Sequence, residues 1–436
     1  MSRKTVAVTG SVLASLMVLA SCGGGGSSSN NEDAGKGEGP VPEPTEPVEV
    51  TFQSWIGTSD EMKQLVKDFE KAHPNISIKL QATTAEGASQ KLTTQIAGGN
   101  PPDTAFVNAS DTSDFASRGA VINLDDYISR SDVVNPDDYV EAFKTFVTYE
   151  DSMYGLPIDG ESTGLFYRTD LFEQAGIDGP PETWEDFQAA AETLTDESAQ
   201  QYGFTLFASE SAYYWYPWLY QAGGDLLTED GKDIAFDSPE AKEAAEFYVN
   251  LANYSPPDYF NSNSYDGRVA FAEGQSAMYV AGAWFAGTMS QEFPKLDGKW
   301  DTAPLPSGPA GCKTTIAGDS LILLEGGDNP DAAWKWIEFL SEPDNLALLT
   351  YKSPGGTLLP PLKSLLNSPD LIKEKPVLKG FAELMECGVA STVSNPKFPR
   401  IEQALNEELG KAIYGEQSAS EALDNAAAEG REILGN

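Results

Sequence analysis

The stretch from residue 48 to residue 107 alternates between two hydrophobic periods, and this restricts the fold more than any other feature of the chain. Strand-like patterns, in which apolar and polar residues alternate, are separated by patterns with apolar residues at helical spacing. Three strands joined by two helices need crossover connections, which predicts a largely parallel sheet in an α/β fold. The expected order is strand, helix, strand, helix and strand, at 48–55, 59–69, 76–80, 88–96 and 104–107.

The ends of two of these strands are where a ligand is expected. Ligands of open α/β sheets bind beyond the carboxyl ends of the strands. The first strand ends in Trp-Ile-Gly-Thr at 55–58, and the third is followed by Asn-Ala-Ser-Asp at 108–111. Both segments are therefore predicted to face a binding site.

Later segments continue the alternation of strand and helix patterns, and the sequence has no internal repeat beyond this alternation. Strands are predicted at 165–167 and 202–206, and helices at 239–252, 331–340, 401–409 and 421–434.

The N-terminus carries the pattern of a secretion signal. Arg3 and Lys4 precede an apolar run that is shorter than the roughly 20 residues needed to span a bilayer. Leu-Ala-Ser-Cys at 19–22 resembles the lipobox of bacterial lipoproteins, in which cleavage leaves a lipid-bearing cysteine as the first residue. A plain signal peptide with a chance cysteine, or a short signal anchor, is the alternative. We expect a signal peptide over 1–21 and lipidation of Cys22.

Residues 22–47 are expected to form a flexible tether. After the cysteine this segment contains no aromatic and almost no aliphatic residue, so it cannot offset its own ordering entropy by burial. Gly and Ser at its start favour flexibility, and Pro-Glu-Pro-Thr-Glu-Pro at its end favours an extended chain. The expected product is a folded body anchored by lipid to the cell membrane, on its extracytoplasmic side.

Length and charge narrow the class of the folded body. The chain has 436 residues, which is more than one hydrophobic core usually serves, so two lobes are expected. It carries 28 basic and 67 acidic residues, a net charge of −39. Such a field repels nucleic acid and anionic lipid, so we expect no nucleic-acid partner. It favours neutral or cationic ligands only weakly, because a local site can override it.

Cysteine and histidine usage excludes several kinds of site. If lipid occupies Cys22, then Cys312 and Cys387 remain for an oxidising compartment, where one disulfide is expected and two isolated buried thiols are the alternative. His73 is the single histidine, and there is no CxxC or HExxH motif. A zinc enzyme or a histidine-based triad is therefore not expected, and neither a metal nor a cofactor is predicted.

Four segments, taken in order, resemble the bacterial extracellular solute-binding proteins of the maltose-binding type, the receptors of ABC importers. The first reads YGLPIDGESTGLFYRTDLFEQAGI and continues to PPETWEDF at 154–187. The second, DGRVAFAEGQSAMYVAGAW, spans 266–284, and the third, GDSLILLEGGDNPDAAWKWIEFLSEPD, spans 318–344. The fourth is SPGGTLLPPLKSLL at 353–366. Each motif alone is weak, but the ordered set extends the resemblance over nearly everything from residue 48 onward.

The resemblance implies a two-lobed periplasmic-binding-protein fold, in which each lobe is a mostly parallel sheet flanked by helices and hinge strands join the lobes. Ligand is then held in the cleft between the lobes, closure by hinge motion presents it to the membrane-spanning permease, and no chemistry is done on it. The protein is expected to act as a monomer. The implied lobes are 48–157 with 303–352, and 158–302 with 353–436.

Sugars are bound by flat aromatic faces and by side chains that exchange hydrogen bonds with hydroxyl pairs. Trp55 and Asp111 are expected at the cleft by their place after strands, although Trp55 can instead pack in the interlobe core and Asp111 can cap a helix. Glu161 and Trp284 fall where the family places a hinge carboxylate and a stacking tryptophan; a solvated loop charge is the alternative for Glu161. The full set of expected ligand contacts is Trp55, Asn108, Asp111, Glu161, Tyr213, Trp215, Trp284, Asp319 and Gly356.

Four more of these expected contacts have explicit alternatives or conditions. Tyr213 and Trp215 belong to a dense aromatic run, of which at least one is expected to face the cleft. Asp319 can be a turn residue at a strand start, and Gly356 can turn the chain rather than offer its amide to ligand. The family pattern also has a basic-acidic pair after the third strand, whereas here Asp111 is followed by Thr-Ser-Asp.

The expected ligand is a carbohydrate, an oligosaccharide in particular. The alternatives are a polyamine, glycerol phosphate or ferric iron in the same receptor, and more remotely a lipid-anchored glycosidase with paired carboxylates. Glycerol phosphate needs basic side chains at the cleft, for which Arg400 is the one candidate. Iron favours paired tyrosines, but adjacent residues of SAYYWYPW at 211–218 would point to opposite faces of an extended strand.

Overall fold

The structure is a computed structural model, and it describes residues 39–206, 211–257, 267–390, 395 and 397–435. The predicted signal peptide at 1–21, Cys22 and most of the predicted tether lie outside the described residues. Among the described residues, no helix combines the length and the apolarity that crossing a membrane requires.

The first lobe is built on a five-stranded sheet with the order β2-β1-β3-β12-β6. β1 pairs in parallel with β2 and β3, as the alternating sequence pattern predicted, whereas β12 runs antiparallel to both β3 and β6. These strands are β1 (Val48–Ser54), β2 (Ile76–Ala82), β3 (Thr104–Asn108), β6 (Leu156–Pro157) and β12 (Asp319–Leu323).

The helices between these strands begin and pack as the sequence predicts. Ser59 precedes α1 (Asp60–Ala72), and its hydroxyl accepts a hydrogen bond of 3.1 Å from the Met62 amide. Met62, Leu65 and Phe69 form the buried face of α1. The next helix, α2 (Ala85–Ala97), packs against β3, and α12 (Pro330–Leu340) packs against β1 and β12.

Strand β3 shows how both faces of this sheet are buried. Ala105 and Val107 belong to one hydrophobic cluster, while Phe106 between them belongs to another. Successive side chains of a strand point to opposite faces, so an uninterrupted apolar run marks a strand covered on both sides.

The second lobe is built on a sheet with the order β13-β11-β7-β9-β8, and β10 pairs with β7 outside this path. β8 pairs in parallel with β9 and β13 in parallel with β11, whereas β7 is antiparallel to β9, β10 and β11. The strands are β7 (Glu161–Tyr167), β8 (Tyr202–Phe204), β9 (Ser276–Gly282), β10 (Asp301–Ala303), β11 (Thr314–Ala317) and β13 (Gly388–Ala390).

Both sheets are therefore mixed rather than mostly parallel, while the predicted two-lobed α/β fold is confirmed. Neighbouring parallel strands need a long crossover, usually a helix. Strands that enter a sheet from the other lobe, such as β12 and β7, are free of that constraint and run antiparallel to their neighbours.

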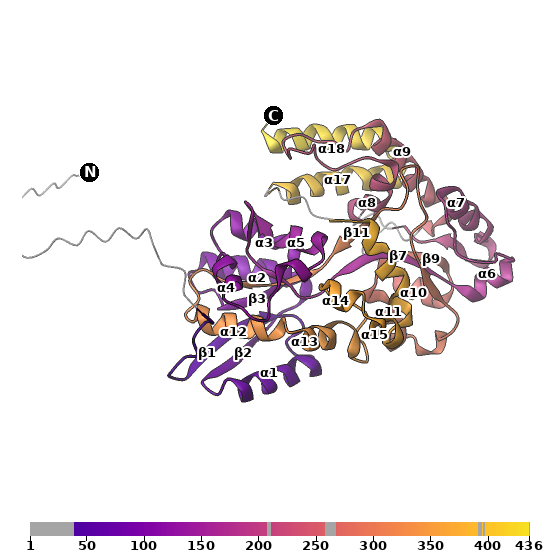
Figure 1. Ribbon diagram of the computed structural model, residues 1–436. Helices are drawn as coiled ribbons and strands as arrows, with labels where there is room; N and C mark the ends of the chain where they lie inside the picture. The colour runs from indigo at the N-terminus through magenta and orange to yellow at the C-terminus, as the bar shows by residue number, and fades with distance from the viewer. Residues whose placement is uncertain (1–38, 207–210, 258–266, 391–394, 396, 436) are drawn as a thin grey trace, which may run out of the picture. The chain divides into compact units, whose positions relative to one another are not determined.

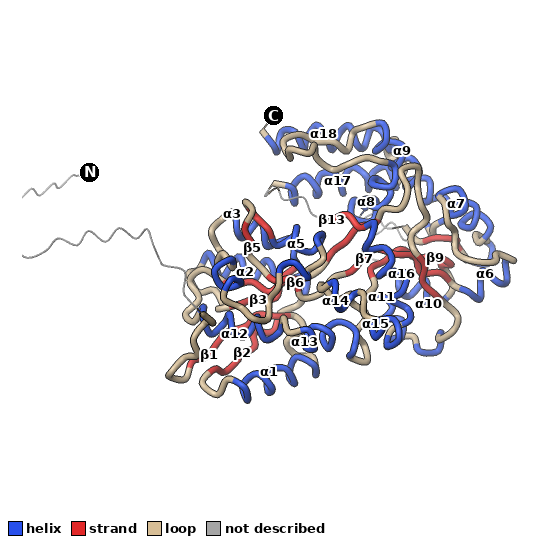
Figure 2. The backbone as a smooth tube through the Cα atoms, viewed as in Figure 1, coloured by secondary structure: helices blue, strands red, loops and turns tan. Residues whose placement is uncertain are grey.

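Helices cover both faces of the second sheet. Met278 and Val280 of β9 join a large cluster with α8 (Ser211–Ala222), α9 (Pro239–Asn250) and α17 (Phe398–Ile413). Tyr279 and Ala281 instead join a cluster with α10, α11 and α16 on the opposite face. Figures 1 and 2 show α17 and α18 side by side near the C-terminus. The helices of the opposite face are α10 (Gly267–Glu273), α11 (Trp284–Glu292) and α16 (Lys379–Leu384), and the C-terminal helix is α18 (Ala419–Leu434).

The chain passes between the two sheets at residues 158–160 and at Gly318. The Ile158 amide donates to the Asp319 carbonyl at 3.0 Å, and Gly160 forms a bridge with Leu359. A Cβ atom on Gly160 would lie 1.9 Å from the Phe143 ring, so only glycine fits this crossing. β11 lies in the second sheet, although the predicted boundary placed 303–352 in the first lobe. The division of the whole chain into lobes stays a prediction.

A disulfide joins Cys312 to Cys387 across 75 residues. Cys312 precedes β11 and Cys387 precedes β13, and these two strands pair in parallel. The bond therefore ties together the starts of two neighbouring strands at one edge of the second sheet.

The remaining helices and strands are shorter or lie further from the crossings. They are α3 (Ala109–Ser117), α4 (Asp125–Ser129), α5 (Glu141–Val147), β4 (Thr148–Tyr149), β5 (Ser152–Met153), α6 (Thr169–Ala175), α7 (Trp184–Thr193), α13 (Pro343–Ala347), α14 (Lys363–Leu366) and α15 (Pro369–Glu374).

Candidate functional site

A cavity of 390 Å³ lies beside the crossings, between residues of the two lobes. The first lobe contributes the start of α3 and Phe146 of α5, and the second contributes the start of β7, Tyr213 of α8 and the start of α17. Its lining residues are Asn108, Ser110, Asp111, Ser113, Asp114, Phe146, Glu161, Tyr213, Ala317, Gly318, Asn395, Phe398, Pro399 and Glu402.

Asn108 and Asp111 reach the cavity because β3 ends there and α3 begins. Asn108 occupies the N-cap position of α3, but its side chain makes no capping hydrogen bond, which leaves the amide for the cavity. Asp111 lies in the first turn rather than at the cap, and its Oδ2 accepts from the Ser89 hydroxyl at 2.8 Å. Burial raises the pKa of the Asp111 carboxyl, although the hydrogen bond from Ser89 opposes the rise.

Glu161 is the first residue of β7 and is half-buried at the cavity wall. Its Oε2 is buried and has no hydrogen-bond partner among the described residues. A Cβ atom on Gly282 would lie 2.0 Å from Oε2 of Glu161 and 2.7 Å from Cδ1 of Trp284. Glycine at 282 therefore lets the carboxyl of Glu161 and the indole of Trp284 come close to each other. Trp284 is half-buried at the start of α11.

Two more carboxyl groups lie behind Glu161, at the crossings. The Asp319 amide donates to Oδ1 of Asp159 at 3.1 Å, and Asp159 is buried. Burial raises the pKa of Asp159 to about 7, and burial together with the nearby Asp159 raises that of Glu161 to about 8. The pKa of Asp319 is raised well above its usual value by burial and then by Asp159, Glu161 and Asp111. The four carboxyl groups thus disfavour one another's ionised forms.

The opposite wall comes from α8 and α17. Tyr213 lies in the first turn of α8, and Glu402 lies on α17, where its Oε1 accepts from the Tyr216 hydroxyl at 2.6 Å. An aromatic ring therefore faces a wall of carboxylates, amides and hydroxyls, a combination that suits a polyhydroxylated ligand.

The charged residues that line the cavity are all acidic. They are Asp111, Asp114, Glu161 and Glu402, and of these Asp114 is ion-paired with Arg118. No Lys, Arg or His of the described residues lines the cavity, and Arg400 is exposed on α17 outside it. Phosphate esters, which need basic groups, therefore find no counter-charge there.

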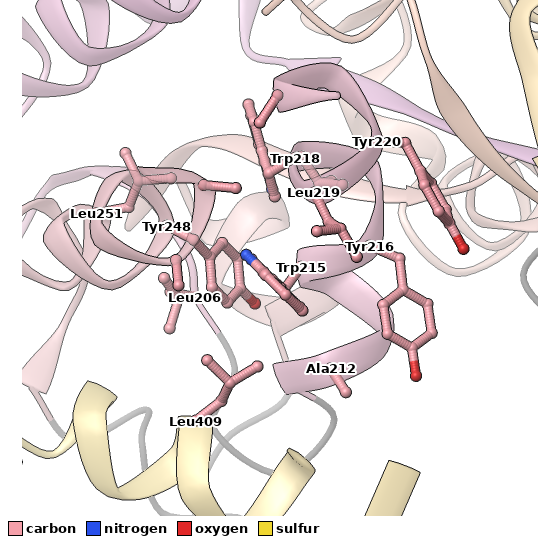
Figure 3. Packing of buried hydrophobic residues seen from close by; sticks show 14 of the residues in the cluster. Leu206, Ala212, Trp215, Tyr216, Trp218, Leu219, Tyr220, Tyr248, Leu251 and Leu409 are labelled. Carbon is pink, nitrogen blue, oxygen red and sulfur yellow. The ribbon is translucent and has the colours of Figure 1, made fainter. Parts of the chain in front are cut away.

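The structure places three expected contacts away from the cavity. Trp215 is completely buried in the second lobe, where Figure 3 shows it with Leu206, Tyr248 and Leu409. Trp55 packs edge-on against Phe106 at 4.6 Å in the first-lobe core. The core therefore covers the Trp215 indole completely, whereas Trp55 is half-buried and packs on the first-lobe core, as the alternative for this residue held.

Gly356 is the third expected contact that lies away from the cavity. Its amide donates to the Ser353 carbonyl at 3.1 Å, and a Cβ there would lie 2.5 Å from the Thr350 carbonyl oxygen. The residue therefore turns the chain, as the alternative reading held, and its N–H is already used.

The aromatic run is also helical rather than extended. Tyr213 and Tyr214 lie on α8 with ring centroids 5.5 Å apart, so the strand argument against a shared metal does not apply. No group of three His, Cys, Asp or Glu residues in the described part of the chain is placed to hold a metal ion.

Sequence reasoning missed the part of the wall formed by Asn395, Phe398, Pro399 and Glu402. The signal available was weak: a Phe-Pro pair just before the predicted helix at 401–409, with nothing to show that this helix start lies across from Asn108. Asp114 had a clearer signal in the Asp-Thr-Ser-Asp run.

Comparison with known proteins shows which family the chain matches. The model of the family described as bacterial extracellular solute-binding protein matches residues 55–347. A putative binding protein of Brucella abortus is 29% identical over 300 residues, which cover 67% of this chain and 71% of the relative. A lactose-binding protein of Rhizobium radiobacter is 26% identical over 311 residues, covering 67% and 70% respectively.

The fold also matches solved structures. An ABC transporter solute-binding protein from Thermotoga lettingae, bound with α-D-tagatose, superposes with a TM-score of 0.78 at 26% identity. The match covers 89% of this chain and 100% of that structure.

Proposed function

Because this chain belongs to the bacterial extracellular solute-binding protein family, whose members are receptors of ABC transporters and not enzymes, we propose that it captures a carbohydrate. The ligand we propose is an oligosaccharide, held in the 390 Å³ cavity and delivered to the permease of an importer. Membership of a receptor family removes the glycosidase alternative. Two relatives that carry sugar names or sugar ligands, the lactose-binding protein and the tagatose complex, support the ligand class.

The observation that best supports this function is the composition of the cavity wall. It combines an aromatic ring with side chains from both lobes that can accept hydrogen bonds from hydroxyl groups. Asn108 and Asp111 come from the first lobe, and Glu161 and Tyr213 come from the second. We propose these four as direct contacts, with Trp284 and Asp319 beside Glu161. A ligand that contacts both walls stabilises the closed arrangement of the lobes.

The anchoring of the chain is a proposal of the same kind. We propose that residues 1–21 are removed and that Cys22 carries lipid, so that the tether 22–47 lets a monomeric receptor reach the permease. Mass spectrometry of the membrane fraction tests this, because the lipid raises the mass of the N-terminal peptide, and Cys22→Ser abolishes the increase. The proposal is overturned by a Cys22→Ser protein that stays in the membrane fraction and whose N-terminal peptide keeps the mass increase.

The ligand proposal is tested by thermal unfolding with a panel of mono- and oligosaccharides, followed by titration calorimetry of those that act. A ligand at a hundred times its dissociation constant adds about 2.7 kcal/mol to the free energy of unfolding. Tyr213→Ala and Asn108→Ala are expected to lose this gain, whereas the exposed Glu229→Gln keeps it. No stabilisation by any saccharide contradicts the proposal and leaves the family unchanged.

A further inference from the structure

The carboxyl group of Glu161 differs from the other acidic groups of the cavity in its hydrogen bonding within the described part of the chain. Other acidic side chains of the wall have partners: Asp111 accepts from Ser89, Asp114 pairs with Arg118, and Glu402 accepts from Tyr216. Oε2 of Glu161 is buried, and none of the residues that the structure describes donates a hydrogen bond to it. A buried acceptor without a donor is costly, so the site is incomplete until a donor arrives.

The charges around Glu161 decide what kind of donor fits best. Asp159, Asp319 and Asp111 are the titratable groups that act on this carboxyl cluster, and Arg118 is the cation that reaches Asp111. Within the described part of the chain, no Lys, Arg or His is among the charges that act on Asp159, Glu161 or Asp319. A hydroxyl forms a hydrogen bond with Glu161 without favouring its ionised form, whereas a protonated amine stabilises the ionised carboxylate, so that amine binding at pH 7 releases the proton that ligand-free Glu161 holds.

The neighbour of Glu161 suits the same group. The place that a Cβ atom of Gly282 would occupy lies 2.0 Å from Oε2 of Glu161 and 2.7 Å from Cδ1 of Trp284, so an ammonium bound to the carboxylate comes close to the indole. Tryptophan is the aromatic side chain that attracts cations most strongly. The strongly acidic chain, with a net charge of −39, adds a long-range attraction of the same sign.

We propose that the natural ligand carries a protonated amine that binds at Glu161, and that it is an amino sugar within a saccharide. This rests on the proposed carbohydrate function and names the ligand class within it. The same ammonium chemistry can be offered by a free polyamine, so the test separates the two sources.

The experiment is titration calorimetry of the wild-type protein at pH 7 with disaccharides that differ in a single substituent. Chitosan disaccharide, diacetylchitobiose and cellobiose share one β-linked skeleton and carry at C2 an amine, an acetamide and a hydroxyl. Glucosamine, N-acetylglucosamine and glucose repeat the comparison without the linkage, and spermidine is the polyamine arm. We expect the amine form to bind about tenfold more tightly than the hydroxyl form, with a preference that falls as salt is raised.

Variants identify the group responsible. Glu161→Gln is expected to lower affinity for the amine form about tenfold more than affinity for the hydroxyl form, whereas Glu229→Gln, an exposed loop glutamate, leaves both affinities unchanged. Asp319→Asn, which removes a second carboxyl group of the cluster, is expected to weaken the amine preference in the same direction.

The outcomes are distinct. Neutral saccharides that bind as tightly as the amine form, with no effect of Glu161→Gln on their ratio, overturn the amine inference while the carbohydrate function stands. Binding of spermidine without any saccharide keeps the ammonium site and overturns the carbohydrate function. Absence of binding across the whole panel overturns both.

Discussion

The raised pKa of Glu161 gives a prediction about stability that requires no ligand. Its pKa rises from 4.5 to about 8 in the folded protein because the carboxyl is buried beside Asp159. Between these values the folded protein keeps a proton that the unfolded chain has released, so the free energy of unfolding falls as pH rises. One such group contributes a slope of about −1.4 kcal/mol per pH unit.

The change that exposes this slope is Glu161→Gln, which keeps the shape and removes the titration. The pKa rise corresponds to at most about 4–5 kcal/mol by pH 8. Because the side chain is half-buried and solvent screens part of the field, we expect the variant to exceed the wild type by about 2 kcal/mol at pH 8. Below about pH 3.5, where both states hold the proton, this contribution vanishes.

Urea unfolding of the ligand-free protein at pH 5, 6, 7 and 8, followed by tryptophan fluorescence, measures the difference. The pKa of Asp159, at about 7, adds its own slope to both proteins, so the difference between them isolates Glu161. Glu229→Gln, which replaces an exposed loop glutamate far from the cluster in the sequence, is the control and should follow the wild type at every pH. A difference between wild type and Glu161→Gln that is constant from pH 5 to pH 8 refutes the reasoning.

Three further predictions concern the scaffold. Replacing Cys312 and Cys387 by Ser removes a cross-link across 75 residues and should lower the free energy of unfolding by about 4 kcal/mol; a double variant whose urea midpoint equals that of the oxidised wild type, both in non-reducing buffer, contradicts it. Gly160→Ala places a methyl group against the Phe143 ring and should cost about 1–3 kcal/mol in the same measurement, whereas an unaltered urea midpoint shows that the crossing can adjust. Trp215→Ala should cost about 3–5 kcal/mol because the indole fills the second-lobe core, and a loss of ligand affinity at undiminished stability is the contrary result.

The regular elements of the fold were predictable because their signals are local. The predicted helix at 331–340 is α12 (Pro330–Leu340), and the predicted helix at 421–434 is α18 (Ala419–Leu434). In each, apolar residues recur at helical spacing and the structure buries that face. The strand at 202–206 is β8 (Tyr202–Phe204), two residues shorter because its pairing with β9 ends there.

The direction of strands was less predictable, because pairing joins residues far apart in the chain. Nothing in the sequence Asp-Ser-Leu-Ile-Leu at 319–323 shows that β12 enters the first sheet from the other lobe and runs antiparallel to β3. The same limit applies to β11, whose four residues could belong to either sheet until its pairing with β7 is known.

The residues of the candidate site show the same difference between local signals and tertiary pairing. The sequence by itself determined that carboxylates and aromatic rings gather near the ends of strands and in the run at 211–218, since these are statements about residue type and order. Only the tertiary structure decided which of them face the cavity. Tyr213 and Trp215 are two residues apart on α8, so the helix turns them about 200° from each other. The core of the second lobe covers the side that carries Trp215, and packing of that core, rather than any local preference, leaves Tyr213 to the cavity.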